Sequence, residues 1–179
     1  APHESQVGRH KGHTVVMGVD WAKQADYTCL SVVCRECARE LALERFNKID
    51  YNYQRERLKS LADKWRVSVI LAESNSIGEP NIDALYHDGL PIRGFQTTAS
   101  SKPPLIESLA LAFERAEVQW LDIPFATSEL EAYERKISAI TGRSQYSAPE
   151  GMHDDTVIAR ALSNKARLEG GTFARAYVY

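Results

Sequence analysis

The chain has 179 residues, of which 44% are hydrophobic and 26% charged, with a formal net charge of −2. This length suits one domain that buries its own core, and the composition is that of an ordinary globular protein rather than a disordered or fibrous one. No apolar run approaches the roughly 18 residues of a membrane span, no signal-peptide pattern opens the chain, and the charge neither supports nor excludes a nucleic-acid ligand.

The first twelve residues are polar and begin with Ala1 rather than with methionine. We interpret residues 1–12 as a linker or tail and residues 13–179 as a single domain. The whole is expected to be a fragment of a longer chain.

The first half of the chain is rich in predicted strands. Runs of β-branched and apolar residues predict strands over residues 14–20, 27–34 and 40–46, and the short polar connections between them favour antiparallel hairpins. Apolar residues at helical spacing then predict an amphipathic helix over residues 53–65. A fourth strand is predicted over residues 67–73.

The next stretch alternates between helix and strand. A helix is predicted to begin at Gly78-Glu79-Pro80 and to end at Gly89. Residues 90–95 form a short predicted strand. A further helix is predicted over residues 101–117, with proline in its first turn.

The last part is predicted to contain two more helices and a small hairpin. Residues 118–121 are expected to be extended, and Ser128 is expected to cap a helix that continues to about Lys136. Residues 137–146 favour two short strands around a glycine-containing turn, and a final helix is predicted over residues 154–168. This order predicts an α/β mixed sheet, in which three antiparallel strands are followed by parallel βα units and helices flank the sheet.

Acidic residues stand at the ends of three of these elements. Asp20 closes the first strand, Glu73 closes the fourth, and Asp154-Asp155 opens the last helix. Open α/β sheets bind ligands at the C-terminal ends of their strands, and converging carboxylates repel one another unless cations neutralise them. The pattern therefore predicts a divalent-metal site.

Asp154 and Asp155 are not equivalent, because neighbouring helical residues point about 100° apart. We expect Asp155 to be a metal ligand and Asp154 to be either a second ligand or an orienting residue. His153, at the start of the same helix, is interpreted as structural.

The cysteines offer a second, weaker metal pattern. Cys34 and Cys37 form a C-x-x-C motif, with His10 and His13 as conceivable partners for zinc. Because the pair flanks a predicted strand-to-strand turn and no second C-x-x-C occurs, the sequence favours an ordinary turn. An odd number of cysteines, three, also favours a reducing compartment.

Four segments, in this order, resemble the nuclease domain of the large terminase subunit of tailed bacteriophages, within the RNase H-like superfamily. They are Gly18–Thr28 (GVDWAKQADYT), Leu71–Gly78 (LAESNSIG), Thr98–Lys102 (TASSK) and Ala148–Asp155 (APEGMHDD). The resemblance spans about residues 14–168. It implies an RNase H-like fold and a metal-dependent endonuclease that cuts concatemeric viral double-stranded DNA during genome packaging.

In that interpretation two Mg²⁺ or Mn²⁺ ions catalyse phosphodiester hydrolysis. Asp20 is expected to bridge both ions, Glu73 and Asp155 to favour one each, and Asp154 to assist. Lys102, between a strand and a helix, and Arg143, at a hairpin tip, are the candidate DNA-phosphate contacts.

The resemblance also implies partners: an ATPase motor in the full chain, a small terminase subunit and the capsid portal, all in the host cytoplasm. No G-x-x-x-x-G-K-[ST] motif occurs, so this chain is not the motor by itself. Two alternatives keep the fold, namely a DNA-gripping module that does not cut and another RNase H-like nuclease such as a junction resolvase. A phosphotransferase of the actin and sugar-kinase type is disfavoured, because Trp21-Ala22-Lys23 stands where that family needs glycines.

Overall fold

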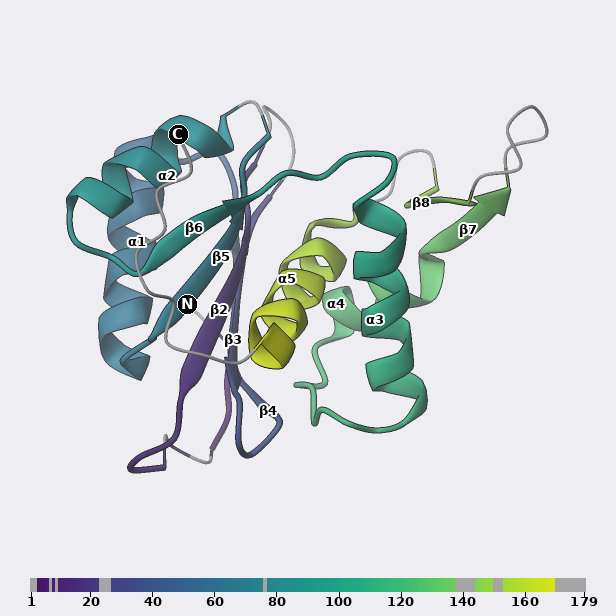
Figure 1. Cartoon of the computed structure of the whole chain (residues 1–179), viewed down its shortest axis with the longest axis horizontal. Helices are drawn as coiled ribbons and strands as arrows, with labels where there is room; N and C mark the ends of the chain where they lie inside the picture. The colour runs from purple at the N-terminus through teal and green to yellow at the C-terminus, as the bar shows by residue number, and fades with distance from the viewer. Residues whose placement is uncertain are drawn as a thin grey trace.

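A computed structural model of the chain describes residues 3–6, 8, 10–22, 27–75, 77–137, 144–149 and 153–169. Its centre is a six-stranded mixed sheet with strand order β1-β4-β3-β2-β5-β6, and helices cover both faces (Figure 1). The strands are β1 (His3–Glu4), β2 (Val15–Asp20), β3 (Thr28–Cys34), β4 (Arg39–Phe46), β5 (Val69–Glu73), β6 (Ile92–Phe95), β7 (Glu134–Ile137) and β8 (Ser144–Ser147). The helices are α1 (Tyr51–Trp65), α2 (Gly78–His87), α3 (Lys102–Glu114), α4 (Pro124–Ala132) and α5 (Asp155–Glu169).

The sheet changes from antiparallel to parallel at its middle strand. β2 pairs antiparallel with β3 and parallel with β5, which in turn pairs parallel with β6. β2, β3 and β5 are buried along their whole length, because helices cover both faces, and such strands are continuously apolar rather than alternating. This confirms the predicted mixed α/β sheet with flanking helices.

Two apolar cores lie on opposite faces of the sheet. On one face, α1 and α2 pack against alternate residues of β2, with Leu58 of α1 and Leu85 of α2 fully buried. On the other face, α3 and α5 pack against the other alternate residues of the strands, with Leu109 and Leu162 among the buried residues. None of the helices within the described residues combines the length and apolar character that a membrane crossing requires.

The predicted helix after Ser128 was wrong in its bounds. Helix α4 starts at Pro124, with Ile123 as its N-cap residue, so Ser128 lies inside the helix rather than before it. Proline suits the first turn of a helix, because its φ is already helical and its missing N–H is not needed there. The helix ends at Ala132 with Tyr133 as its C-cap residue, and residues 134–136 belong instead to strand β7, which pairs antiparallel with β8.

The polar N-terminal stretch contains one short pairing. His3 and Glu4 form β1, which pairs antiparallel with Leu43 and Ala42 of β4 at the edge of the sheet. The division of the chain into residues 1–12 and 13–179 stays a prediction.

Candidate metal centre

Asp20 and Glu73 stand side by side at one edge of the sheet. Val19 of β2 lies opposite Ala72 of the parallel strand β5, so the next residue of each strand is the neighbour of the other. Side chains alternate along a strand, and Val16 and Leu71 belong to the core on the α5 face. By the same alternation, the carboxyl groups of Asp20 and Glu73 point towards α5.

Helix α5 brings Asp155 to the same place. A Cβ atom on Gly18 would lie 2.1 Å from the carbonyl oxygen of Ala159 and 2.3 Å from the backbone nitrogen of Ser163, so the helix backbone rests directly on β2. Asp155, Ala159 and Ser163 are spaced four residues apart and share one helical face. Asp155 therefore faces β2 one helical turn before Ala159, near the strand end that carries Asp20.

The three carboxyl groups are buried and affect one another. Asp20, Glu73 and Asp155 are 7%, 9% and 6% exposed. Burial raises the pKa of Asp20 well above its ordinary value, and the charges of Glu73 and Asp155 raise this pKa further. The carboxyl groups of Asp20 and Glu73 also lie close enough to share a hydrogen bond. Such a site favours a cation or a retained proton.

Asp154 is more exposed and is paired with a cation. The ammonium group of Lys102 lies 3.3 Å from Oδ2 of Asp154 and also sits above the ring of Tyr133, 5.8 Å from its centroid. Lys102 thus reaches the acidic cluster from the start of α3, and its contact with a DNA phosphate stays a prediction. The pairing is compatible with either predicted role of Asp154.

The backbone and side chains around α5 hold Asp155 in place. The N–H of Tyr27 donates to Oδ2 of Asp155 at 3.3 Å. Nδ1 of His153 lies 3.6 Å from the same oxygen, and its ring packs edge-on against Tyr27. His153 therefore borders the site, and its structural role stays a prediction.

Glu129 and Arg45 support the site and were not predicted from the sequence. The Glu129 carboxylate accepts hydrogen bonds from the backbone N–H of Thr156, at 3.0 Å, and from the Thr156 hydroxyl. Glu129 thereby caps the first turn of α5. Arg45 pairs with Glu129 at 2.6 Å and stacks on Tyr27, 3.7 Å from its ring centroid. The partners are far apart in sequence, so spacing alone carried no signal for them.

The carboxylate oxygens of Asp20, Glu73 and Asp155 do not form one of the compact groups of potential metal ligands. Among the described residues, the groups whose ligand atoms all lie within 4.8 Å of one another are formed by histidine, cysteine and Glu36 side chains instead. A wider spacing suits carboxylates that share two ions about 3.5–4 Å apart. Arg143, the second predicted DNA contact, lies outside the described residues.

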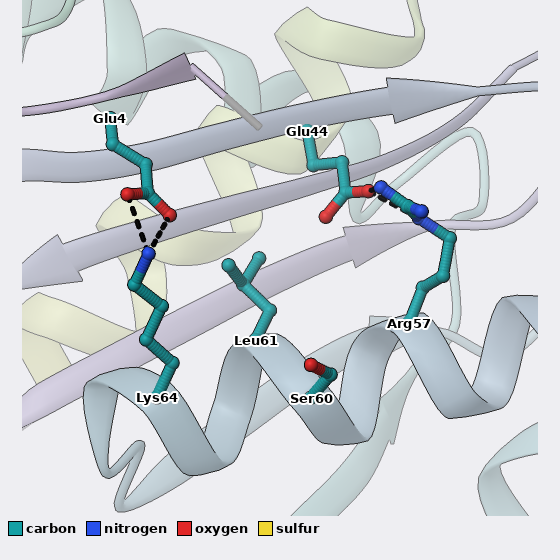
Figure 2. A pocket seen from close by; sticks show the side chains of 6 residues that line it. All are labelled: Glu4, Glu44, Arg57, Ser60, Leu61 and Lys64. Atoms are coloured by element: carbon teal, nitrogen blue, oxygen red, sulfur yellow. Dashed lines mark hydrogen bonds and ion pairs between the residues drawn. The ribbon is translucent and has the colours of Figure 1, made fainter. Parts of the chain in front are cut away.

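The described residues also line cavities away from this edge. One, of about 220 Å³, lies between α1 and the β1–β4 edge, where Lys64 pairs with Glu4 at 2.6 Å and Arg57 pairs with Glu44 (Figure 2). Another, of about 360 Å³, lies between α3 and the end of α5 and is largely apolar. Neither cavity is lined by Asp20, Glu73 or Asp155. The candidate site therefore rests on the meeting of these carboxyl groups and not on a cavity.

The chain is similar to known proteins in sequence and in fold. The family model described as "Terminase RNaseH-like domain" matches residues 17–165. This chain belongs to that family. The match includes all four predicted acidic residues and confirms the resemblance to the large terminase nuclease domain of bacteriophages.

Relatives of this terminase RNaseH-like domain come from Thermus phages. The large terminase subunit of Thermus virus P23-45 is 28% identical over 152 residues, which are 84% of this chain and 31% of that protein. The chain therefore spans about a third of the length of such a relative.

Solved structures of terminase nucleases share the fold. A crystal structure of the large terminase nuclease from the thermophilic phage G20c has a TM-score of 0.81 at 26% identity, with 88% of this chain and 84% of that chain covered. The G20c nuclease has also been solved with bound magnesium and with bound cobalt. The nuclease domain of Thermus phage P74-26 has a TM-score of 0.77 at 26% identity, covering 88% of this chain and 81% of that one.

Proposed function

We propose that this terminase domain is a divalent-metal-dependent endonuclease that cuts concatemeric viral double-stranded DNA during genome packaging. The observation that carries the proposal is the meeting of three buried carboxyl groups, from β2, β5 and α5, at one edge of the sheet. Their mutual repulsion, expressed in the raised pKa of Asp20, is relieved when cations bind between them.

The donor set fits hard cations. Carboxylate oxygens are the ligands that Mg²⁺ and Mn²⁺ prefer, and the related G20c nuclease has been solved with magnesium. Asp20 lies between Glu73 and Asp155 and would bridge two ions, with Glu73 and Asp155 each holding one. When bound, such ions activate a water molecule and stabilise the leaving 3′-oxygen.

The side chains of this domain supply placement and charge. The Tyr27 N–H and the Glu129 cap fix Asp155 against rotation, and Lys102 offers a cation to a DNA phosphate beside the cluster. Arg143 is proposed as a second phosphate contact. No side-chain nucleophile is needed, because the attacking group is water.

The packaging role rests on the family and on the longer relatives. We propose that the full chain also carries an ATPase motor and works with a small terminase subunit and the capsid portal in the host cytoplasm. The motor would move DNA, and this domain would cut it.

Plasmid nicking in the presence of Mn²⁺ tests the proposal. Asp20→Asn and Asp155→Asn should lower cleavage by about 100-fold or more, because metal-ion stabilisation of a transition state is worth several kcal/mol. Asp63→Asn is the matched control, since Asp63 is exposed on α1, on the opposite face of the sheet, and should cut normally.

The alternatives give different outcomes in the same assay. A gripping module would bind plasmid without cutting it under any divalent metal. A junction resolvase would cut four-way junctions much faster than linear duplex. Undiminished cleavage by Asp20→Asn would remove the acidic cluster as the catalytic centre.

A further inference from the structure

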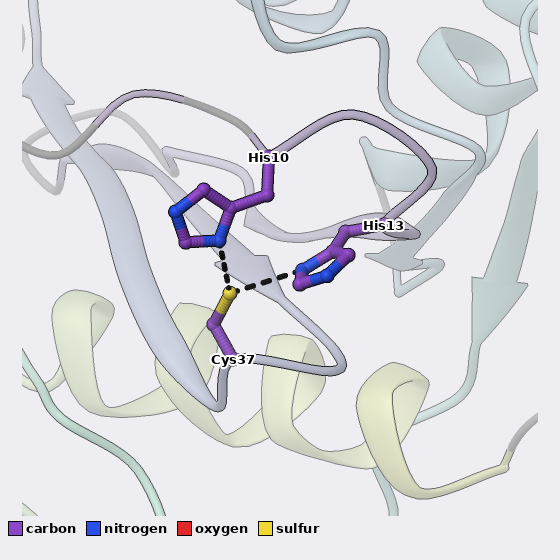
Figure 3. A group of neighbouring side chains, drawn as sticks. All are labelled: His10, His13 and Cys37. Carbon is purple, nitrogen blue, oxygen red and sulfur yellow. Dashed lines mark hydrogen bonds between the residues drawn. The ribbon is translucent and has the colours of Figure 1, made fainter.

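A second group of metal-ligand side chains lies at the other end of β2. The ligand atoms of His10, His13 and Cys37 all lie within 4.8 Å of one another (Figure 3). Nδ1 of His10 is 2.9 Å from Sγ of Cys37, and Nδ1 of His13 is 3.0 Å from the same sulfur. Figure 3 shows both rings pointing at the Cys37 sulfur from the loop that precedes β2.

Cys34 lies beside this group, and at the same 4.8 Å separation it groups with His13 and Glu36. Its sulfur lies 3.5 Å from Nδ1 of His13, and the backbone N–H of Cys37 donates to it at 3.4 Å. Burial raises the pKa of the Cys34 thiol, and this N–H opposes the rise. The sequence pattern is therefore H-x-x-H followed by C-x-x-C, two nitrogen and two sulfur donors.

Three nitrogen-to-sulfur distances are close to those around a tetrahedral ion. With Zn–S of about 2.3 Å and Zn–N of about 2.0–2.1 Å, tetrahedral geometry separates a nitrogen from a sulfur ligand by about 3.5 Å. The His13–Cys34 separation of 3.5 Å already has this value. The shorter contacts to Cys37, at 2.9 and 3.0 Å, need to open by about half an ångström. The Cys34 sulfur must also move closer to His10 and Cys37 for all four side chains to bind one ion.

The backbone holds the two halves of the group together without a metal ion. The N–H of Arg35 donates to the carbonyl of Thr14 at 2.9 Å, and the N–H of Thr14 donates to the Glu36 carboxylate at 2.7 Å. The N–H of His13 also donates to the carbonyl of His10 at 3.3 Å. The donors are thus gathered at the β3–β4 turn in advance of binding.

We propose that His10, His13, Cys34 and Cys37 form a binding site for a thiophilic divalent cation, of which zinc is the best fit. The bound ion would fasten the segment before β2 to the turn between β3 and β4. This site is separate from the acidic edge, because the length of β2, about 17 Å at 3.3 Å per residue, lies between them. Its ligands are soft, whereas those of the acidic edge are hard, so the two sites select different ions.

The sequence pattern alone favoured an ordinary turn, because one C-x-x-C is weak and its histidine partners come earlier in the chain. The structure adds the convergence of both histidines on the Cys37 sulfur. Glu36 is a competing fourth ligand, since it groups with His13 and Cys34. Its carboxylate is already engaged by the Thr14 N–H, which favours Cys34.

Cobalt titration of the reduced, chelator-stripped chain tests the site. Excess Mg²⁺ is present throughout, so that the carboxylates of the acidic edge are occupied by a hard ion. Co²⁺ bound by thiolate gives a near-ultraviolet charge-transfer absorption that carboxylate ligands do not give. We expect this absorption to saturate at one equivalent of Co²⁺ and to disappear when Zn²⁺ is added.

Single substitutions assign the ligands. His10→Ala and Cys37→Ser should weaken binding by more than the roughly 10- to 100-fold that follows loss of an outer-shell partner. His87→Ala is the histidine control, since His87 is exposed at the end of α2. Cys34→Ser should also weaken binding, and Glu36→Gln should not; the reverse result would overturn the assignment of the fourth ligand.

A readout independent of spectroscopy is limited proteolysis at Lys11, which is exposed and lies between the two histidines. Zn²⁺ should slow tryptic cleavage there in the wild-type chain but not in Cys37→Ser, because fixing a segment lowers its local opening. Asp20→Asn should keep both the absorption and the protection, which separates this site from the nuclease centre. Absence of the absorption, or a disulfide between Cys34 and Cys37 under reducing conditions, would overturn the proposal.

Discussion

Asp20 makes the stability of the metal-free domain depend on pH. Burial and two neighbouring carboxyl groups raise its pKa in the folded protein above the value near 3.8 of an ordinary aspartate. Between these two pKa values the folded state binds more protons than the unfolded state, so stability falls as pH rises through that window. Above the raised pKa the domain carries the whole penalty of an ionised Asp20.

Replacing Asp20 by asparagine should remove that penalty. In EDTA at pH 8, Asp20→Asn should melt a few degrees above wild type, since about 1 kcal/mol shifts the melting temperature of a 150–250-residue domain by roughly 2–4 °C. Near pH 4 the two proteins should melt together. Thermal melts at both pH values check this, with Asp63→Asn as the control that leaves the pH dependence unchanged.

Added Mg²⁺ should reverse the order of the two proteins at pH 8. The ion binds the folded wild-type protein and stabilises it, whereas Asp20→Asn lacks one of the metal ligands and gains less stability. A wild-type protein that melts higher at pH 8 than at pH 5 in EDTA would contradict the raised pKa of Asp20.

Residues at element ends were predictable, whereas residues that act through long-range contacts were not. Asp20 and Glu73 end apolar runs, and this local pattern placed them together on the condition that their strands are neighbours, which the pairing of β2 with β5 meets. Arg45 pairs with Glu129 across 84 positions of sequence, and no periodicity relates the two. The support of Asp155 could therefore be seen only in three dimensions.

Helix α5 is the element that completes the site, and its position depends on the missing side chain at Gly18. A Cβ atom there meets backbone atoms of Ala159 and Ser163, which cannot rotate away as a flexible side chain could. The helix is also anchored by a buried bidentate pair, in which Arg160 donates to Glu40 at 2.8 and 3.1 Å. A change at Gly18 is thus transmitted to Asp155 rather than absorbed locally.

We expect Gly18→Ala to destabilise the domain by about 1–3 kcal/mol or more, as overpacking in a well-packed core does. Cleavage in Mn²⁺ should fall as well, even where the protein is still folded, because Asp155 moves away from Asp20. Chemical denaturation and plasmid nicking measure the two effects. Gly8→Ala is the control, since a Cβ atom there meets nothing within 4 Å.

At the scale of elements, periodicity located strands β2 to β6 and most helices, but it missed β1 and misjudged the region around α4. Ser128 resembles a helix cap in sequence, yet Pro124 begins the helix, and pairing with β8 draws Glu134–Ile137 into a strand. Local propensity was overridden there by a pairing partner later in the chain. Caps and strand pairs compete most where an element is short.

The whole molecule carries nearly balanced charge, with 22 lysine and arginine residues against 24 aspartate and glutamate residues. Few phosphate contacts are therefore available to one domain. The carboxylates at the acidic edge also repel DNA unless cations are present. Binding by this domain alone should be weak and independent of sequence. Placement on DNA would depend on the motor proposed for the full chain.

Duplex affinity should fall steeply with salt, because each phosphate contact releases about one counterion. Lys102→Ala should lower the slope of log K against log salt by about one unit, measured by fluorescence anisotropy in Mg²⁺ with Asp20→Asn as the background to prevent cutting. Lys64→Ala removes the same charge from the opposite face, where Lys64 pairs with Glu4, and should leave the slope unchanged. An affinity that is flat in salt, or tight for one short sequence, would indicate recognition of bases and would count against a packaging nuclease.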